Sequence, residues 1–308
     1  MKNKLGIDIG DSVIKFVFND SCLTIDTPDN AVKDGSLVTF DAMADLIKET
    51  VKENGIKQKN VCLIIPDENV FLNRLHMPKM NEKQLMVNLP YEFKELVGNN
   101  KDDYLYDYAV IDNSDGLELL AAAVEKSLIE KYSEMFTTAG LKLVKALPRQ
   151  LAISNLLRKT DNSGDVGFLD LGYSHTRIDI YNNYYFNAGR NLENGVKDMC
   201  DIVSEIKFCD SHTALNFLKE NDEVLNNQKI IDYYEDIGVK IARAINYYTY
   251  ENRDNKLETL YYYGGGSHFE KFISVLEHAC PIDVKPVSYL FEGEDMLDVL
   301  DACGALED

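Results

Sequence analysis

Two turns in this chain have the residue types of anion-binding loops. Asp8-Ile-Gly10 and Asp170-Leu-Gly172 each follow a short apolar run. In each turn the glycine lacks a Cβ, so the backbone can approach an anion closely and can adopt positive φ values. Successive backbone amides in such a turn can form a concave anion-binding site. The two turns therefore predict two phosphate-binding loops.

Charged and hydroxyl side chains accompany both turns. Asp8 and Asp170 are hard oxygen ligands, which suit a magnesium ion that keeps most of its waters. Lys15 stands seven residues beyond Asp8, where its ammonium group could reach a phosphate as a point charge. Ser174 and Thr176 follow the second turn closely. We therefore expect these groups to lie around phosphate and magnesium.

A third glycine-rich segment follows later in the chain. Gly264-Gly265-Gly266-Ser267 comes directly after the apolar run Leu260 to Tyr263 and directly before a helical pattern that contains Phe269 and Phe272. Such a loop between a strand and a helix could accommodate a base and a ribose. Each of the three glycine segments is a weak signal alone, but their order and spacing together favour a nucleotide site.

The elements around these segments repeat. Leu5 to Ile9 and Val13 to Phe18 are two short strand-like runs joined by turn residues, and Val166 to Leu171 with Thr176 to Tyr181 repeat the unit about 160 residues later. This repeat predicts two related halves.

Helical and strand patterns alternate along the rest of the chain. Apolar residues at helical spacing predict helices over 41–54, around 128–136 with an end at Gly140, and over 229–251. Val61 to Ile65, ended by Pro66, predicts a buried strand. The fold class is therefore α/β.

Composition and charge exclude several functions. The 308 residues include 32 Lys and Arg against 52 Asp and Glu, a net charge of −20, which repels nucleic-acid backbones and anionic lipid. The six cysteines are scattered without metal-site spacing, as expected of reduced thiols. No apolar stretch reaches the roughly 18 residues of a membrane span, and no signal-peptide core follows the first residues. We expect a cytoplasmic protein without nucleic-acid partners.

The three glycine segments resemble the motifs of the actin-like ATPase superfamily, in the same order. Gly6 to Lys15 is similar to the phosphate-1 motif, Phe168 to Thr176 to phosphate-2, and Tyr263 to Phe269 to the adenosine motif. Within the superfamily the chain resembles the PilM family of type IV pilus assembly, and next to it the FtsA cell-division family. The resemblance covers almost the whole chain, and it adds Asp11 and Ser12 to the expected nucleotide contacts.

This resemblance implies a two-lobed, RNase H-like ATPase fold with an inserted small α+β subdomain. The implied divisions are subdomain IA at 1–78 and 147–164, the insertion IC at 79–146, IIA at 165–189 and 246–308 with a C-terminal connecting helix, and a helical IIB at 190–245.

The resemblance also implies ligands and partners. ATP with Mg²⁺ would bind between the lobes, and a groove bounded by IA and IC, around residues 60–95, would hold the cytoplasmic N-terminal peptide of a PilN-like inner-membrane protein. The chain would then reach the membrane only through this partner, and self-association is a further expectation.

Departures from the family pattern bear on activity. Relatives carry a glutamate and a lysine near the ribose, and the matching segment Leu215 to Lys219 keeps Lys219 but has Asn216 at the acidic position. Gln150, in a connecting helix, or Asp11 could orient the attacking water. We expect at most a slow ATPase. A pseudo-ATPase adaptor, an FtsA-like protein and a small-molecule kinase are the alternatives.

Overall fold

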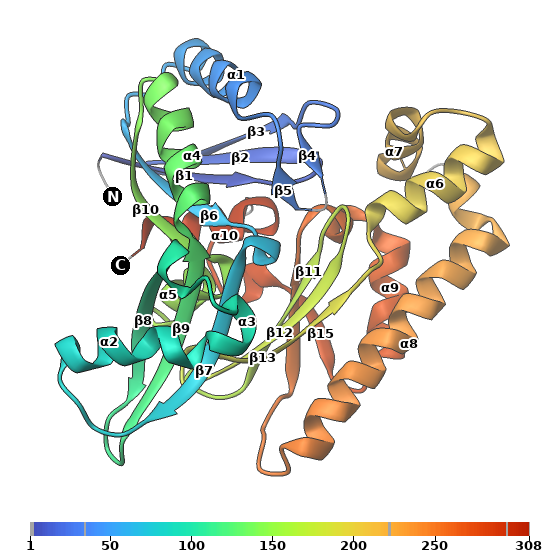
Figure 1. Cartoon of the computed structure of the whole chain (residues 1–308). Coiled ribbons are helices and arrows are strands. Elements are labelled where there is room, and N and C mark those ends of the chain that lie inside the picture. Colours follow the sequence, from blue (N-terminus) through green and yellow to red (C-terminus); the bar gives the residue numbers. More distant parts are fainter. Residues whose placement is uncertain (1–2, 34, 221–222, 294, 308) are drawn as a thin grey trace. The chain divides into compact units, whose positions relative to one another are not determined.

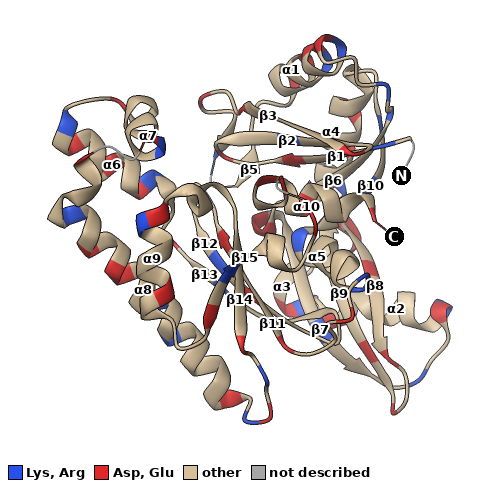
Figure 2. Cartoon of the chain, turned by 180° about the vertical axis from the view of Figure 1, so that it is seen from behind, with Lys and Arg blue, Asp and Glu red and all other residues tan. Residues whose placement is uncertain are grey.

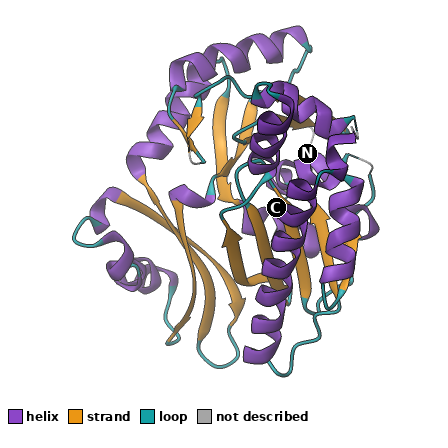
Figure 3. Ribbon diagram, turned by 90° about the vertical axis from the view of Figure 1, so that its right-hand side faces the viewer, coloured by secondary structure: helices purple, strands orange, loops and turns teal. Residues whose placement is uncertain are grey.

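The structure is a computed structural model that describes residues 3–33, 35–220, 223–293 and 295–307 (Figure 1). By its internal contacts the chain forms two compact units, residues 1–156 with 301–308 and residues 157–300, here called unit 1 and unit 2. Helices and strands occur in both units, and Figure 3 colours them by type. Among the described residues no helix combines the length and apolarity needed to cross a bilayer.

The main sheet of unit 1 has the strand order β10-β6-β1-β2-β3, in which β10, β6 and β1 are parallel and β1, β2 and β3 form antiparallel hairpins. Helices α1 and α4 pack on this sheet through Met43, Ile47 and Phe136. The elements are β1 (Lys4–Ile9), β2 (Val13–Phe18), β3 (Ser21–Asp26), β4 (Val32–Lys33), β5 (Ser36–Leu37), α1 (Phe40–Glu53), β6 (Asn60–Ile65), η1 (Asp67–Asn69), α4 (Lys126–Thr138), β10 (Lys142–Pro148), α5 (Arg149–Leu157) and α10 (Met296–Leu306). The last residue of α5 and the first five of α10 are counted in unit 2.

A second, antiparallel sheet of unit 1 is inserted between β6 and α4. Its strand order is β7-β9-β8, and the helices α2 and α3 cover one face through Leu89, Phe93 and Val97. These elements are β7 (Val70–Met77), α2 (Glu82–Glu92), α3 (Lys94–Val97), η2 (Lys101–Asp103), β8 (Tyr104–Asp112) and β9 (Leu117–Glu125). The insertion therefore has the α+β character that the resemblance implies.

Unit 2 is built on a sheet with the order β13-β12-β11-β14-β15. One core cluster joins this sheet to the helices through Leu169, Ile178, Ile241 and Phe272. Its elements are β11 (Val166–Leu171), β12 (Thr176–Asn182), β13 (Tyr185–Leu192), α6 (Val196–Lys207), α7 (Ser211–Lys219), η3 (Glu223–Asn226), α8 (Gln228–Glu251), β14 (Thr259–Tyr263), η4 (Gly265–His268), α9 (Glu270–Ala279), β15 (Asp283–Pro286) and η5 (Val287–Tyr289).

The two main sheets have the same topology. In each, an antiparallel three-stranded meander is followed by two strands that add in parallel beside the first strand of the meander. The strands β1, β2, β3, β6 and β10 of unit 1 correspond in order to β11, β12, β13, β14 and β15 of unit 2. The repeat predicted from the two hairpins thus extends over whole sheets.

The observed elements and units differ from the implied subdomain limits. The limits at 146/147, 189/190 and 245/246 fall inside β10, β13 and α8, and unit 1 ends at 156 whereas the implied IA continues to 164. Residues 301–308, which the resemblance gives to IIA, belong to unit 1. These residues join unit 1 because α10 packs closely on α5 at Gly304, where a Cβ would stand 2.2 Å from the Ala152 carbonyl oxygen. Asn155 of α5 also donates to the Gly304 carbonyl oxygen.

Candidate functional site

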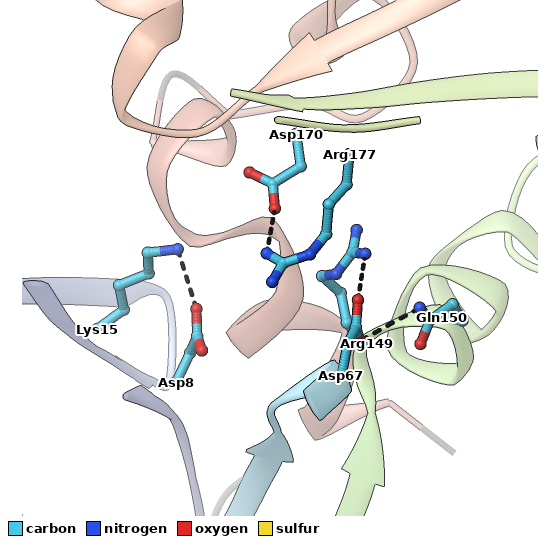
Figure 4. Close-up of polar contacts among 7 residues, drawn as sticks. All are labelled: Asp8, Lys15, Asp67, Arg149, Gln150, Asp170 and Arg177. Atoms are coloured by element: carbon cyan, nitrogen blue, oxygen red, sulfur yellow. Dashed lines mark hydrogen bonds and ion pairs between the residues drawn. The ribbon is translucent and has the colours of Figure 1, made fainter. Parts of the chain in front are cut away.

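The first predicted phosphate loop joins β1 to β2 in unit 1. Asp8 and Lys15 are cross-strand partners in this hairpin, and Lys15 Nζ donates to Asp8 Oδ2 at 2.9 Å (Figure 4). Their side chains are only 15% and 16% exposed. The lysine therefore neutralises the aspartate inside its own hairpin.

A neighbouring threonine fixes the backbone of this first turn. The Gly10 amide donates to the Val13 carbonyl oxygen at 3.0 Å. Thr27 Oγ1 donates to the Gly10 carbonyl oxygen at 2.7 Å, and the Thr27 amide donates to the Ser12 carbonyl oxygen at 2.9 Å. The Asp11 carboxylate accepts from the Gly35 amide at 3.2 Å, which gives it a structural task. Sequence reasoning missed Thr27, which lies outside the motif.

The second predicted loop joins β11 to β12 in unit 2. Asp170 is 9% exposed, and its cross-strand partner Arg177 places Nη1 3.6 Å from Asp170 Oδ2 (Figure 4). Sequence reasoning also missed Arg177. The available signal was its spacing, since Arg177 follows Asp170 by the same seven residues by which Lys15 follows Asp8.

The start of α6 holds the second turn in place. The carbonyl oxygens of Gly172 and Tyr173 accept from the amides of Val196 and Lys197 at 3.1 and 2.9 Å. Gly172 admits no side chain, because its Cβ would lie 2.8 Å from the His175 carbonyl oxygen. Of the two expected hydroxyl residues, Thr176 is 2% exposed and covered by protein. Ser174 is partly exposed.

The triglycine segment lies against the second turn, within unit 2. Gly264 has φ +91°, and a Cβ there would stand 2.7 Å from Asp170 Oδ1. A Cβ at Gly266 would stand 2.9 Å from Leu171 Cβ, whereas a Cβ at Gly265 would meet nothing within 4 Å. Ser267 is 8% exposed, and its Oγ has no hydrogen-bond partner among the described residues. This buried hydroxyl beside an open backbone surface suits a polar ligand.

Two residues of α10 contact the two ends of the triglycine segment. His268 Nε2 lies 2.8 Å from Asp298 Oδ1, and the Gly264 amide donates to the Leu297 carbonyl oxygen at 2.7 Å. The hydrogen bond to Asp298 raises the pKa of His268, against lowering contributions from burial and from the charge of Lys219. Asn216 is exposed on α7, which also contains Lys219.

In unit 1, the two residues that open α5 both contact Asp67 of η1. Arg149 Nη2 donates to Asp67 Oδ2 at 2.8 Å, and Gln150 Nε2 donates to Asp67 Oδ1 at 3.2 Å (Figure 4). Gln150 is 8% exposed, and its Oε1 has no hydrogen-bond partner among the described residues. The amide is thus oriented by Asp67, and its acceptor oxygen is buried.

The donor sets fit a nucleotide better than a metal held by protein alone. Within the described ranges, no three His, Cys, Asp or Glu side chains gather to hold a metal ion. Asp8 and Asp170 could each contribute to a magnesium ion only as isolated carboxylates, consistent with an ion that keeps its waters. The glycine turns and the Ser267 hydroxyl supply the backbone and side-chain groups that phosphate and sugar need.

Solved structures with the same fold span this chain. A chain of the PilM-PilN type IV pilus biogenesis complex matches with a TM-score of 0.83 at 20% identity, covering 99% of this chain and 98% of that one. The ethanolamine utilization protein EutJ from Carboxydothermus hydrogenoformans matches with 0.61 at 17% identity, covering 99% and 89%. An archaeal actin homologue matches with 0.52 at 14% identity, covering 98% and 97%. The fold is that of the actin-like ATPases.

Comparison at the level of families is more specific. A search of curated proteins finds no match. The family model described as type IV pilus assembly protein PilM matches residues 6–294, which is most of the 308-residue chain. On this ground, together with the two hairpin turns and the triglycine segment, the chain belongs to the PilM family of type IV pilus assembly proteins.

Proposed function

We propose that this chain is an ATP-binding scaffold of a type IV pilus or related secretion or competence machine. The observation that carries the nucleotide part is the convergence of Asp170, Gly264 and Ser267 in unit 2. Segments almost 100 residues apart in sequence meet there, and the Ser267 hydroxyl is buried with no hydrogen-bond partner in the described part of the chain. Family membership supports the role in pilus assembly.

Each unit contributes its own groups to the nucleotide. Backbone amides of the two turns other than that of Gly10, which bonds Val13, would donate to phosphate oxygens, and Lys15 would exchange its contact with Asp8 for a phosphate. Ser267 would bond the nucleoside, and the ribose would lie near Lys219 and Asn216. Magnesium would neutralise phosphate charge while Asp8 and Asp170 orient its waters.

Hydrolysis would be slow at most. Phosphoryl transfer needs an oriented water, and positioning and electrostatics supply most of the acceleration. Gln150 is the better candidate, because its Oε1 has no partner among the described residues while Asp67 fixes its Nε2. Asp11 is the weaker candidate, because its carboxylate already accepts from the Gly35 amide. A pseudo-ATPase adaptor is the second reading, favoured by the cations that already neutralise Asp8 and Asp170.

The partner would be the cytoplasmic N-terminal peptide of a PilN-like inner-membrane protein. Support comes from the fold match to a PilM-PilN complex. The family resemblance implies a groove around residues 60–95, which includes β6 and β7. Val61 to Ile65 cannot line it, because these residues of the interior strand β6 are at most 4% exposed. Strand β7 is the better candidate, since it is an edge strand with half-buried side chains.

Leu72 offers a test of this peptide site. It lies on β7 between Phe71 and Asn73, and so points to the sheet face opposite that of Phe71, which packs against α2 and α3. The purified full chain is titrated with the N-terminal cytoplasmic peptide of the PilN-like protein encoded nearby. We expect a low-micromolar dissociation constant, about −8 kcal/mol. Leu72→Glu is expected to weaken binding about tenfold or more.

Val87→Glu is the matched control. Val87 is 67% exposed on α2, so this change adds the same charge to an apolar surface outside β7. If only Val87→Glu loses peptide binding, the peptide binds at α2 and not at β7. Absence of binding by the wild-type chain would contradict the scaffold role. Through such a partner the cytoplasmic chain would gather at the inner face of the membrane, and self-association stays a further proposal.

A further inference from the structure

Unit 2 contains a cavity that the nucleotide and peptide proposals do not use. It has a volume of about 590 Å³ and lies between the hairpin β12-β13 and the C-terminal half of α8. The apolar side chains of Ile178, Ile180, Ala188 and Leu192 line its sheet side. This volume lies within the range of ligand pockets, roughly 300–1,000 Å³.

Cross-strand register explains why these side chains share one face. Ile178 pairs with Arg190, Ile180 with Ala188, and Thr176 with Leu192. Directly opposed residues of an antiparallel pair project from the same side of the sheet. Strand β13 ends its sheet, so no described strand pairs with its outer backbone edge. The cavity thus adjoins a row of backbone donors and acceptors open to another strand.

The charge of the cavity is opposite to that of the chain. Its lining includes Arg190, Lys240 and Arg243 against one acid, Glu251, whereas the chain carries a net charge of −20 and acidic residues spread over its surface (Figure 2). Arg190 and Arg243 are exposed, and their side chains form no ion pair or hydrogen bond with another described residue. Lys240 pairs with Asp236 at 2.7 Å. Two guanidinium groups are therefore available to carboxylates.

One stripe of α8 sets the length of the occupant. Lys240, Arg243, Tyr247 and Glu251 recur at helical spacing along the cavity. From Lys240 to Glu251 the helix rises about 16 Å at about 1.5 Å per residue. An extended strand covers that distance in about five residues. Tyr247, 68% exposed, adds an aromatic wall of the kind that anchors protein contacts.

We propose that this cavity binds an extended acidic peptide segment, about five residues long, that adds as a strand to the free edge of β13. Alternate residues of the segment project on the cavity face of the sheet, where two carboxylates pair with Arg190 and Arg243 and an apolar residue between them packs beside the apolar side chains of the hairpin. This is a second protein-docking site, located in unit 2, and it does not depend on the function proposed above.

The test uses defined probe peptides and the full chain. A fluoresceinyl-Glu-Thr-Val-Thr-Glu-amide, whose two Glu and one Val share a strand face, is titrated by anisotropy at about 0.15 M salt. Two matched probes carry Lys in place of Glu, or N-methyl groups on alternate amides, which keep the charge but block strand pairing. We expect the acidic probe to bind with a dissociation constant of tens of micromolar, and each of the other two to bind about tenfold or more weakly.

Charge reversal locates the site. In the double variant Arg190→Glu, Arg243→Glu we expect the dissociation constant of the acidic probe to rise about tenfold or more. The control is Arg253→Glu, at an exposed arginine just beyond α8, and we expect it to change this constant less than about twofold. Circular dichroism and the melting temperature confirm folding of each variant. Equal binding of the N-methylated probe would overturn strand addition. Equal effects of both charge reversals, or displacement of the probe by millimolar inorganic phosphate, would overturn the peptide site.

Discussion

Arg177 faces Asp170 across the hairpin of β11 and β12, and Arg177 Nη1 lies 3.6 Å from Asp170 Oδ2. Lys15 and Asp8 have the same relationship across β1 and β2. Each predicted phosphate turn thus has its own cation on the return strand. A phosphate that enters either turn would meet a positive charge already in place, and the carboxylate would be released toward magnesium.

The Asp170–Arg177 pair predicts a stability effect set by burial. Arg177→Gln leaves a carboxylate that is nine-tenths buried with less compensation, so we expect a loss of about 2 kcal/mol in the free energy of unfolding. The double variant with Asp170→Asn is expected to show a coupling of about 1 kcal/mol. Urea denaturation measures both.

Lys285→Gln is the control for that experiment. Lys285 pairs with Asp283 at a shorter 2.8 Å, but the two side chains are 41% and 68% exposed. We expect a loss of less than about 0.5 kcal/mol, because exposed pairs contribute little. If Arg177→Gln lowers the free energy of unfolding no more than Lys285→Gln does, the prediction from burial of the Asp170–Arg177 pair is wrong.

Two neighbouring glycines should respond differently to valine. Gly265→Val meets open space, so we expect a folded protein with a melting temperature near that of the wild type and no measurable ATP binding. Gly264→Val combines φ +91° with contact against Asp170, so we expect it to be unstable. Thermal unfolding and ATP titration separate the two. Normal ATP binding by Gly265→Val would show that the triglycine segment is a turn that does not contact the nucleotide.

Turnover, if present, should depend on Gln150 and not on Asp11. Gln150→Met is expected to reduce phosphate release about tenfold or more without changing ATP affinity, because it removes the oxygen that orients water. Asp11→Asn should leave the rate within about twofold, because Asp11 holds the Gly35 amide. If Asp11→Asn lowers the rate and Gln150→Met does not, Asp11 is the residue that orients the water. No release by the wild-type chain would favour the pseudo-ATPase.

His268 should make stability depend on pH. Its pKa is raised above 6.5 by Asp298, so the folded state binds the proton more tightly than the unfolded state. The His268–Asp298 pair therefore gives its full stabilisation of the folded state below about pH 6.5. This stabilisation is lost as the pH rises through the raised pKa of His268 in the folded state. NMR titration should show a lower pKa for His268 in Asp298→Asn, with the other histidines as internal references. An unchanged pKa would contradict the pair.

Local patterns predicted much of the fold. The hairpins around Gly10 and Gly172, the strand before the triglycine and the long helix α8 all appear close to their expected limits. Their signals are apolar periods bounded by glycine, and these need no information from distant residues. The fold class and the family were predicted correctly on the same motifs.

What sequence reasoning missed depends on distant contacts. The end of β13 reads Asn187-Ala-Gly-Arg-Asn191, which has no strand period, and pairing with β12 makes it a strand. The attachment of residues 301–308 to unit 1 follows from the approach of Gly304 to Ala152, which has no local signature. Thr27 bonds the first turn from the position directly after β3, and no motif includes it.

The central claim is that the two turns and the triglycine segment bind ATP with magnesium. Calorimetric titration of ATP into the full chain, with and without magnesium, tests it most directly when run on the wild type and on Asp8→Ala. We predict micromolar, magnesium-dependent binding by the wild type, about −8 kcal/mol, and loss of most of the magnesium-dependent part in folded Asp8→Ala. Absence of ATP binding by the wild type, or the same magnesium dependence in both proteins, would contradict the claim.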